Sequence, residues 1–327
     1  YLAGEHIPLS IGEKENGNLI FPNSGIKPDE EDFWLETGAV IELNIKTKSF
    51  VSYGIDNNII DGRWGISHQD SYSNYMLVNQ ISKDTFGNIW VTNPYCEKNG
   101  NLLAIQMAND ETWSHVHIPD NNSFRPQTVA FDQSNRAWIG FAYDALENTI
   151  YSNGGIKILE YTNLNFSAVD DSSWLTISNP DAMPGGSQDA SVWSIAFDKM
   201  NHLWILNEKG IRVFEGYKYN SLNKTITLDP FNVLDQDGNE IPYDFLSHIS
   251  YTKGNRIRVD SQNNKWVITH QGIWVILEST KYWPSANGLN TENSGLLSDI
   301  VYDVAFDDDK GLAYLATDKG ISILQIP

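Results

Sequence analysis

His270 is the residue of this sequence best suited to acid–base chemistry, although no evident partner stands beside it in the sequence. His115 and His117 would share one face of a strand, but no third metal ligand accompanies them. Asp235-Gln-Asp-Gly-Asn-Glu240 resembles a calcium loop in composition. Its glycine is fourth rather than sixth, so a hairpin turn is favoured. We therefore predict no cofactor, with Ca²⁺ as the one metal that the acidic turns leave open.

Binding is favoured over catalysis, because the sequence contains none of the common catalytic motifs. It has no nucleophile elbow, no His-Glu-x-x-His zinc motif, no P-loop and no glycine-rich dinucleotide turn. Aromatic side chains can stack on sugar rings, and polar side chains can bind hydroxyl groups. Each such residue can equally be a loop residue that fills local space. The candidate binding residues are Trp64, His68, Tyr95, Arg125, Tyr143, Asp144, Glu208, His270 and Asp318.

A repeated unit must position these residues, and it is the strongest pattern in the chain. Each copy has an alternating apolar strand, an aspartate, a short polar turn, an aromatic residue and a second strand. The aspartate precedes the aromatic residue by six positions in four copies and by seven in the last. The five pairs are Asp84 with Trp90, Asp132 with Trp138, Asp198 with Trp204, Asp260 with Trp266 and Asp307 with Tyr314.

The repeat predicts a hairpin capped by its aspartate. Gly or Asn stands three residues after the aspartate in four copies, and Gly311 is shifted by one in the last. These residue types tolerate positive φ best, and an aspartate carboxylate can accept the N–H groups of a turn. We therefore assign the five aspartates to structural turns and the repeat tryptophans to sheet packing.

Four strands per repeat predict an all-β protein with the β-propeller fold. A third strand opens with glycine at Gly155, Gly210, Gly272 and Gly320, and a more polar fourth strand follows it. Phe33–Thr37 matches the second strand of a further copy. The blade aromatics are then Trp34, Trp90, Trp138, Trp204, Trp266 and Tyr314. These spacings favour six four-stranded blades in a single domain over residues 1–327, and they also allow seven.

The N-terminal segment is expected to close the ring. The last copy lacks a fourth strand, which His6–Ile11 can supply, and Leu19–Phe21 can serve as the inner strand of the first blade. The chain begins at Tyr1 rather than at methionine, so we expect an excised or processed piece of a longer protein.

Chain direction separates two kinds of connection. The aspartate turns lie on one face of the predicted propeller, whereas connections from strand two to strand three and from strand four to the next blade lie on the other. The second kind contains the long segments, which often carry function on a rigid scaffold. They are Tyr53–Val78, Asn93–Asn101, Phe141–Gly154, Asn179–Ser191, Asp229–Gly254 and Pro284–Ser298. We predict the binding site on this face.

The repeat Asp-x-x-Gly/Asn-x-x-Trp-Ile/Val-x-Thr, followed by Gly-Ile-x-x-Phe/Leu, resembles the two-component regulator propeller repeat over residues 33–327. Asn293-Ser-Gly-Leu-Leu-Ser-Asp299 resembles the linker of that family. The resemblance implies either the periplasmic sensor region of a hybrid two-component system or a PorZ-like protein of type IX secretion. It thereby implies a secreted, periplasmic or outer-membrane-surface location. A more distant resemblance, to streptogramin-lyase propellers, would instead imply a lyase or hydrolase.

Composition narrows the partners further. The formal charge is −20, with 22 Lys and Arg against 42 Asp and Glu, so we expect no nucleic-acid partner. No apolar run approaches the ~18 residues of a membrane span. The sequence thus predicts a non-catalytic module outside the cytoplasm that binds a glycan or an envelope protein. A polysaccharide or streptogramin-type lyase or hydrolase is the alternative.

Overall fold

The computed structural model describes residues 10–25, 36–62, 75–96, 101–119, 123–146, 149–162, 166, 169–186 and 189–327. The chain divides into two compact units. Unit 1 comprises residues 1–177, 189–191 and 220–225, and unit 2 comprises residues 178–188, 192–219 and 226–327. The described residues are all-β with short 3₁₀ turns, as the sequence predicts, and none of their helices is long and apolar enough to cross a membrane.

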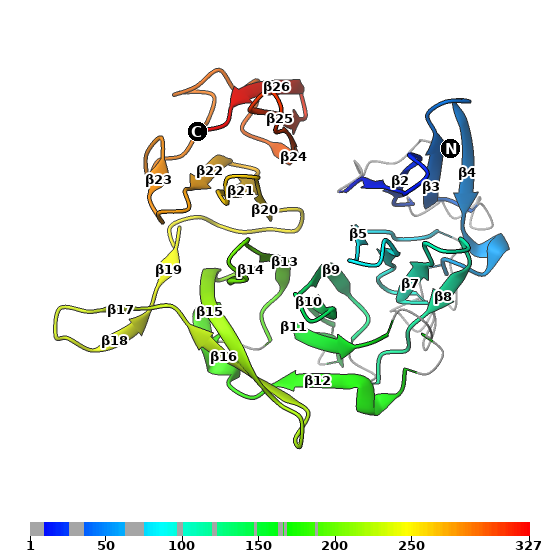
Figure 1. The fold of residues 1–327 in the computed structure, drawn as a ribbon, viewed down its shortest axis with the longest axis horizontal. Coiled ribbons are helices and arrows are strands. Elements are labelled where there is room, and N and C mark those ends of the chain that lie inside the picture. Colours follow the sequence, from blue (N-terminus) through cyan, green and yellow to red (C-terminus); the bar gives the residue numbers. More distant parts are fainter. Residues whose placement is uncertain are drawn as a thin grey trace. The chain divides into compact units, whose positions relative to one another are not determined.

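Unit 1 holds three groups of four antiparallel strands among its described residues. We call each such group a sheet, and its strands pair in chain order (Figure 1). The first sheet contains β1 (Gly12–Glu13), β2 (Leu19–Asn23), β3 (Ala39–Asn44) and β4 (Ser49–Tyr53). The second contains β5 (Ile81–Lys83), β6 (Ile89–Thr92), β7 (Leu103–Gln106) and β8 (Trp113–His115). The third contains β9 (Pro126–Phe131), β10 (Arg136–Leu146), β11 (Thr149–Glu160) and β12 (Trp174–Ile177). The 3₁₀ turns η1 (Ile55–Asn57) and η3 (Asp171–Ser173) lie between strands.

Unit 2 repeats this plan with one insertion. The fourth sheet contains β13 (Val192–Phe197), β14 (Leu203–Asn207), β15 (Gly210–Asn220) and β16 (Thr225–Pro230), and β19 (Asp244–Phe245) also pairs with β15. The inserted hairpin is β17 (Asn232–Leu234) and β18 (Glu240–Pro242). The fifth sheet contains β20 (Arg256–Val259), β21 (Lys265–Thr269), β22 (Gly272–Ile276) and β23 (Tyr282–Trp283). The sixth contains β24 (Val301–Asp307), β25 (Leu312–Thr317) and β26 (Gly320–Gln325), and the 3₁₀ turns are η4 (Pro180–Ala182) and η5 (Pro184–Gly186).

Consecutive sheets pack face to face within each unit. In unit 1, β5 contacts β1 and β2, and β9 contacts β5 and β6. In unit 2, β20 contacts β13 and β14, and β24 contacts β21. The contacts are made by the first and second strands of each sheet. Several second strands are buried along their whole length, such as Ile89–Thr92 and Leu203–Asn207. This succession of small sheets is propeller-like.

The first sheet corrects the strand assignment made from sequence. Leu19–Phe21 belongs to the second strand, β2, and the first strand is β1. The reason is the tight turn between them, in which Gly17 has a φ of 81° and donates its N–H to the Lys14 carbonyl. Trp34, which was assigned to a second strand, lies outside the described residues, and so does most of His6–Ile11.

A second correction concerns Phe141–Gly154, which the sequence suggests is a loop. It is a continuation of strands β10 and β11, with Phe141 opposite Gly155, Tyr143 opposite Asn153 and Asp144 opposite Ser152. The residues at the two ends of the predicted loop pair in antiparallel register. Their backbone N–H and C=O groups therefore hydrogen-bond to one another across the two strands. This extended hairpin carries two of the candidate binding residues.

Candidate functional site

The aspartate of each repeat binds both its own turn and the tryptophan six residues later. One oxygen of Asp84 accepts the N–H groups of residues 86 and 88, and the other accepts Nε1–H of Trp90 at 3.0 Å. The same three bonds recur in the three following copies. They join Asp132 to Trp138 at 3.0 Å, Asp198 to Trp204 at 3.2 Å and Asp260 to Trp266 at 2.9 Å. The residue three after each aspartate has positive φ, namely Gly87, Asn135, Asn201 and Asn263. The six-residue spacing therefore reflects a buried side-chain hydrogen bond as well as packing.

Two further turns vary this arrangement. Asp307 accepts both the backbone N–H and the ammonium group of Lys310 and is partly exposed in the sixth sheet. Asp235 accepts N–H groups from Asp237 and Asn239 at the tip of the β17–β18 hairpin. The segment Asp235–Glu240 thus forms a hairpin turn. No group of three His, Cys, Asp or Glu side chains suited to a metal ion is present among the residues that the structure describes.

Four candidate residues from separate segments come together in unit 1, and we call them the Tyr95 cluster: Tyr95, Arg125, Tyr143 and Asp144. The hydroxyl of Tyr95 donates to Oδ2 of Asp144. The Arg125 guanidinium lies 5.5 Å from the centre of the Tyr95 ring and 3.5 Å from the same Asp144 oxygen. The side chains of Arg125 and Asp144 remain about one quarter exposed, and Tyr143 is 41% exposed. The cluster thus presents an aromatic ring, a cation and a carboxylate to solvent.

The backbone that holds the Tyr95 cluster is unusual at two points. Tyr95 has a φ of 61°, a conformation that is costly for an aromatic residue, and its N–H donates to the Phe124 carbonyl at 2.6 Å. A β-bulge lies between Asp144 and Ala145. Bulges change the direction of side chains and are common next to functional sites. The N–H of Tyr143 donates to the hydroxyl of Ser191, so the exposed end of β10 is fixed from a second segment. Local strain of this kind tends to accumulate at functional sites.

The structure does not gather the other candidates into this cluster. Trp64 and His68 lie outside the described residues. Glu208 is exposed in the β14–β15 turn and pairs with Lys209, whereas Asp318 is exposed in the β25–β26 turn. His115 contacts the Ile59 carbonyl through Nε2 at 3.1 Å, and His117 is exposed.

His270 lies in a charged region of unit 2 that sequence reasoning did not find. Its ring meets Tyr302 edge to face at 6.1 Å, and burial together with nearby Arg256 lowers its pKa below the usual value. Arg256 and Arg258 of β20 both bind Asp303 of β24, with N–O distances of 3.1 and 2.8 Å. Burial lowers the pKa of Arg256 to about 10. The three residues join the fifth and sixth sheets as a partly buried ion-pair group, in which Arg256 is the most buried member.

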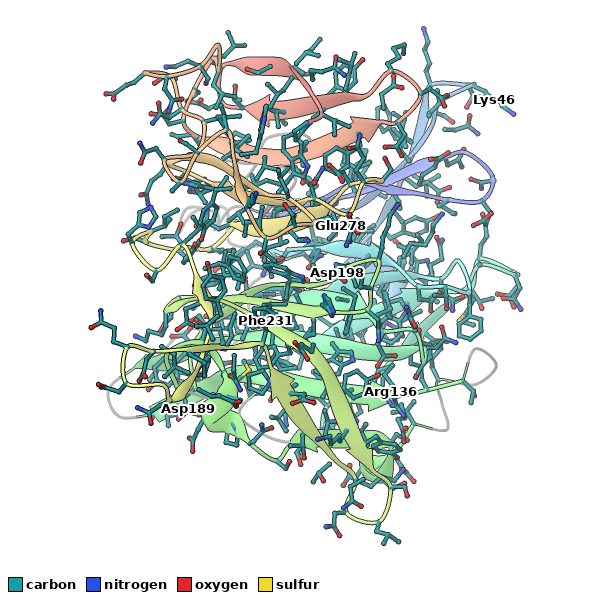
Figure 2. The ribbon with its side chains drawn as sticks, turned by 60° about the vertical axis from the view of Figure 1, so that its left-hand side comes forward. Lys46, Arg136, Asp189, Asp198, Phe231 and Glu278 are labelled. Carbon is teal, nitrogen blue, oxygen red and sulfur yellow. The ribbon has the colours of Figure 1, made fainter. Side chains whose placement is uncertain are left out.

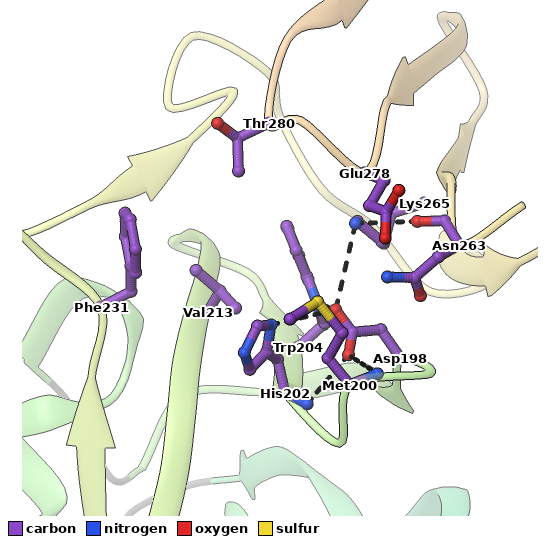
Figure 3. A pocket seen from close by; sticks show the side chains of 10 residues that line it. All are labelled: Asp198, Met200, His202, Trp204, Val213, Phe231, Asn263, Lys265, Glu278 and Thr280. Atoms are coloured by element: carbon purple, nitrogen blue, oxygen red, sulfur yellow. Dashed lines mark hydrogen bonds and ion pairs between the residues drawn. The ribbon is translucent and has the colours of Figure 1, made fainter.

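A pocket opens between the fourth and fifth sheets of unit 2, beside the aspartate turns. Figure 2 labels three of its lining residues, Asp198, Phe231 and Glu278. Its cavity volume is about 60 Å³, and it is partly open to solvent. Its lining residues are Asp198, Met200, His202, Trp204, Val213, Phe231, Asn263, Lys265, Glu278 and Thr280. We call it the Lys265 pocket, because the ammonium group of Lys265 points into it toward Asp198 and Asn263 (Figure 3).

The Lys265 pocket was missed because it lies beside the aspartate turns, which the sequence analysis assigned to structure alone. One sequence signal could have found it. Lys265 occupies the position just before the repeat aromatic residue, where the other copies carry Ile89, Ala137, Leu203 and Ala313. A charged residue at a position that is otherwise apolar breaks the pattern of the fold, and such breaks are expected at functional sites.

Comparison with solved structures places this fold beside three proteins of related architecture. No protein-family model matches the sequence, and no curated protein matches it. The structure is similar to PorZ, a surface component of the type IX secretion system of Porphyromonas gingivalis, with a TM-score of 0.58 and 18% identity. It is also similar to the extracellular domain of the hybrid two-component system BT4673 of B. thetaiotaomicron, with a TM-score of 0.50 and 16% identity. A streptogramin B lyase matches with a TM-score of 0.50 and 14% identity.

The extent of these matches is uneven. They cover 98%, 97% and 96% of this chain, but only 47% of PorZ and 33% of the BT4673 domain, against 77% of the lyase. The chain thus spans about half or less of the first two proteins. At these identities the comparisons establish the fold alone. The PorZ and BT4673 matches agree with the resemblance of the repeats to two-component regulator propellers.

Proposed function

We propose that this chain is a non-catalytic binding module that recognises a glycan through the Tyr95 cluster. The observation that carries the proposal is the meeting of Tyr95, Arg125 and Asp144, from three separate segments. Tyr143, whose side chain is 41% exposed, precedes Asp144 on β10, and its carbonyl accepts a hydrogen bond from Arg125. Aromatic rings bind the apolar face of a sugar, and arginine and carboxylate groups bind its hydroxyls. The positive φ of Tyr95 supports a functional role, because backbone strain of this kind is common at functional sites.

We also propose a cellular location for the module. PorZ is a bacterial surface component and the BT4673 domain is extracellular, which supports a location outside the cytoplasm and a part in type IX secretion or in sensing. We further propose six blades, one for each repeated group of strands: β1–β4, β5–β8, β9–β12, β13–β16, β20–β23 and β24–β26.

A glycan array followed by titration of the bound glycan tests this function. We expect Arg125→Gln and Tyr143→Ala each to weaken binding by about tenfold or more, as at buried or aromatic hot spots. The matched control is Phe50→Ala, which removes another exposed aromatic ring of unit 1 from β4. Binding that survives both cluster variants would refute the site. If an envelope protein co-purifies with the chain and no glycan binds, the partner is a protein rather than a glycan.

His270 supports a second candidate, a lyase or hydrolase. Its lowered pKa leaves the imidazole neutral near pH 7, the form that accepts a proton, and the fold is shared with a streptogramin B lyase. Turnover of a sugar polymer or a streptogramin that is lost in His270→Ala would establish this candidate. Binding without turnover, unchanged in that variant, would favour the module.

A further inference from the structure

We propose that the Lys265 pocket is a binding site for a small phenolic group, separate from the Tyr95 cluster and independent of glycan binding. Consecutive sheets are separated by equivalent gaps, because the repeat places the same backbone positions around each one. The side chains that fill these gaps can therefore be compared. The residue before the repeat aromatic faces the preceding sheet, as Ile89 does where it packs with Ile20 and Val40 of the first sheet. Its equivalents Ala137 and Ala313 also lie in apolar clusters.

Lys265 is the charged exception at this position. Its side chain is only 2% exposed, and its ammonium group makes one hydrogen bond among the described residues, to the Asn263 carbonyl at 2.9 Å. Asp198 is 3.9 Å away, too far for a hydrogen bond, and the ring of Trp204 lies 5.1 Å from the ammonium nitrogen. A buried ammonium group with three donors and one close acceptor is costly, and burial lowers its pKa accordingly. An acceptor from a ligand would complete its hydrogen bonding.

The gap between the second and third sheets shows which group suits this environment. There the side chain of Tyr161 packs against Trp90, with ring centres 5.0 Å apart, and its hydroxyl donates to Asp84 at 3.0 Å. Trp90 and Asp84 are the equivalents of Trp204 and Asp198. In the gap between the fourth and fifth sheets, Oδ2 of Asp198 accepts the indole N–H of Trp204 and lies 3.3 Å from Nδ1 of His202. No tyrosine hydroxyl donates to Asp198 among the described residues, and the pocket lies beside it.

A phenol would therefore find in this pocket the surroundings that Tyr161 has in unit 1. The ring would lie among Trp204, Val213 and Phe231, which give the pocket its apolar wall. The hydroxyl would accept a hydrogen bond from Lys265 and donate one to Asp198, so the lysine would gain the acceptor that it lacks. Asp198 already accepts two backbone N–H groups and the Trp204 indole. A bare anion fits less well, because Asp198 and Glu278 carry two negative charges beside one lysine.

Fluorine NMR of the intact chain with 4-fluorophenol tests this inference. We expect saturable line broadening with a dissociation constant of about 1 mM, a usual value for so small a ligand. Lys265→Leu should weaken binding by about tenfold or more while leaving the melting temperature unchanged or higher, since it restores the apolar residue of the other copies. The matched control is Lys310→Leu, which removes an exposed lysine from the last aspartate turn.

Several results would overturn the inference. They are no saturable binding of 4-fluorophenol, equal binding of fluorobenzene, or binding that Lys265→Leu leaves intact. Val213→Trp, which fills the pocket without touching the lysine, must also abolish binding, so a poorly folded lysine variant cannot decide the outcome alone. Glycan binding by the Tyr95 cluster plays no part in this assay, so either proposal can fail while the other stands.

Discussion

At the scale of single residues, the repeat is organised by one carboxylate that serves two elements. Each repeat aspartate closes a turn through one oxygen and binds the indole of the following strand through the other, as Asp260 does for Trp266. Both side chains are almost fully buried. The hydrogen bond therefore fixes the turn relative to the strand in a place where water cannot substitute for a lost partner.

The first prediction concerns this aspartate. Asp260→Ala removes the acceptor of two turn N–H groups and of the Trp266 indole, which leaves buried donors unpaired. We expect a loss of about 2 to 4 kcal/mol in the free energy of unfolding, measured by urea denaturation followed by fluorescence. Asp237→Ala, in the exposed hairpin turn, should change stability by less than about 0.5 kcal/mol. Equal effects of the two changes would contradict the role of the Asp–Trp bond.

At the scale of elements, the glycine that opens each third strand is constrained to different degrees. Gly272 and Gly320 both have positive φ, 114° and 125° respectively. A Cβ at position 272 would lie 2.4 Å from the Leu289 carbonyl oxygen, whereas at position 320 its nearest neighbour would be a Leu297 methyl carbon at 3.5 Å. We expect Gly272→Ala to destabilise the chain by about 2 kcal/mol more than Gly320→Ala, compared by thermal melting. A smaller loss of stability at position 272 would show that the segment around Leu289 moves away from the new Cβ at little cost.

The contact between β20 and β24 predicts a dependence on pH. Burial alone would raise the pKa of Asp303, but Arg258 and Arg256 outweigh burial, and the net shift is downward. A carboxylate with a lowered pKa in the fold contributes stability above its unfolded value of about 3.9, and this contribution is lost as the pH falls through the folded value. Asp303→Asn should therefore cost about 3 kcal/mol at pH 7, and its difference from the wild type should shrink below about pH 4. Denaturation at pH 7 and pH 3 measures this, and a constant difference would contradict it.

At the scale of elements, the sequence predicts some strands and misses others. The Asp–Trp spacing predicts the hairpins and the succession of sheets, because each copy repeats the same local chemistry. It predicts neither the first strand, β1, a two-residue strand with no repeat pattern, nor the continuation of β10 and β11 through Tyr143, which is paired only through its backbone. Of the site, sequence places Tyr95, Arg125, Tyr143 and Asp144 on a common face, but their contact depends on a positive φ and a bulge that no pattern announces.

At the scale of the whole molecule, the net charge of −20 affects stability through repulsion between distant residues. Like charges repel across the folded surface, and the repulsion is relieved when the chain expands. Salt screens it, since the Debye length falls from about 30 Å at 0.01 M to about 10 Å at 0.1 M. The described ion pairs act in the opposite sense, because salt also weakens their attraction, but several are buried and thus less screened, among them Arg256 with Asp303.

Repulsion should therefore dominate the response to salt, and the melting temperature should rise between 0.01 and 0.1 M NaCl, an interval in which the Debye length shortens about threefold. Differential scanning calorimetry measures the shift. Sucrose at matched osmolarity provides the control, since it does not screen charge. The same charge predicts strong retention on an anion exchanger and none on immobilised heparin, a polyanion. A melting temperature that falls with added salt would mean that attractive pairs outweigh the net charge, and the acidic surface would then need an explanation other than solubility.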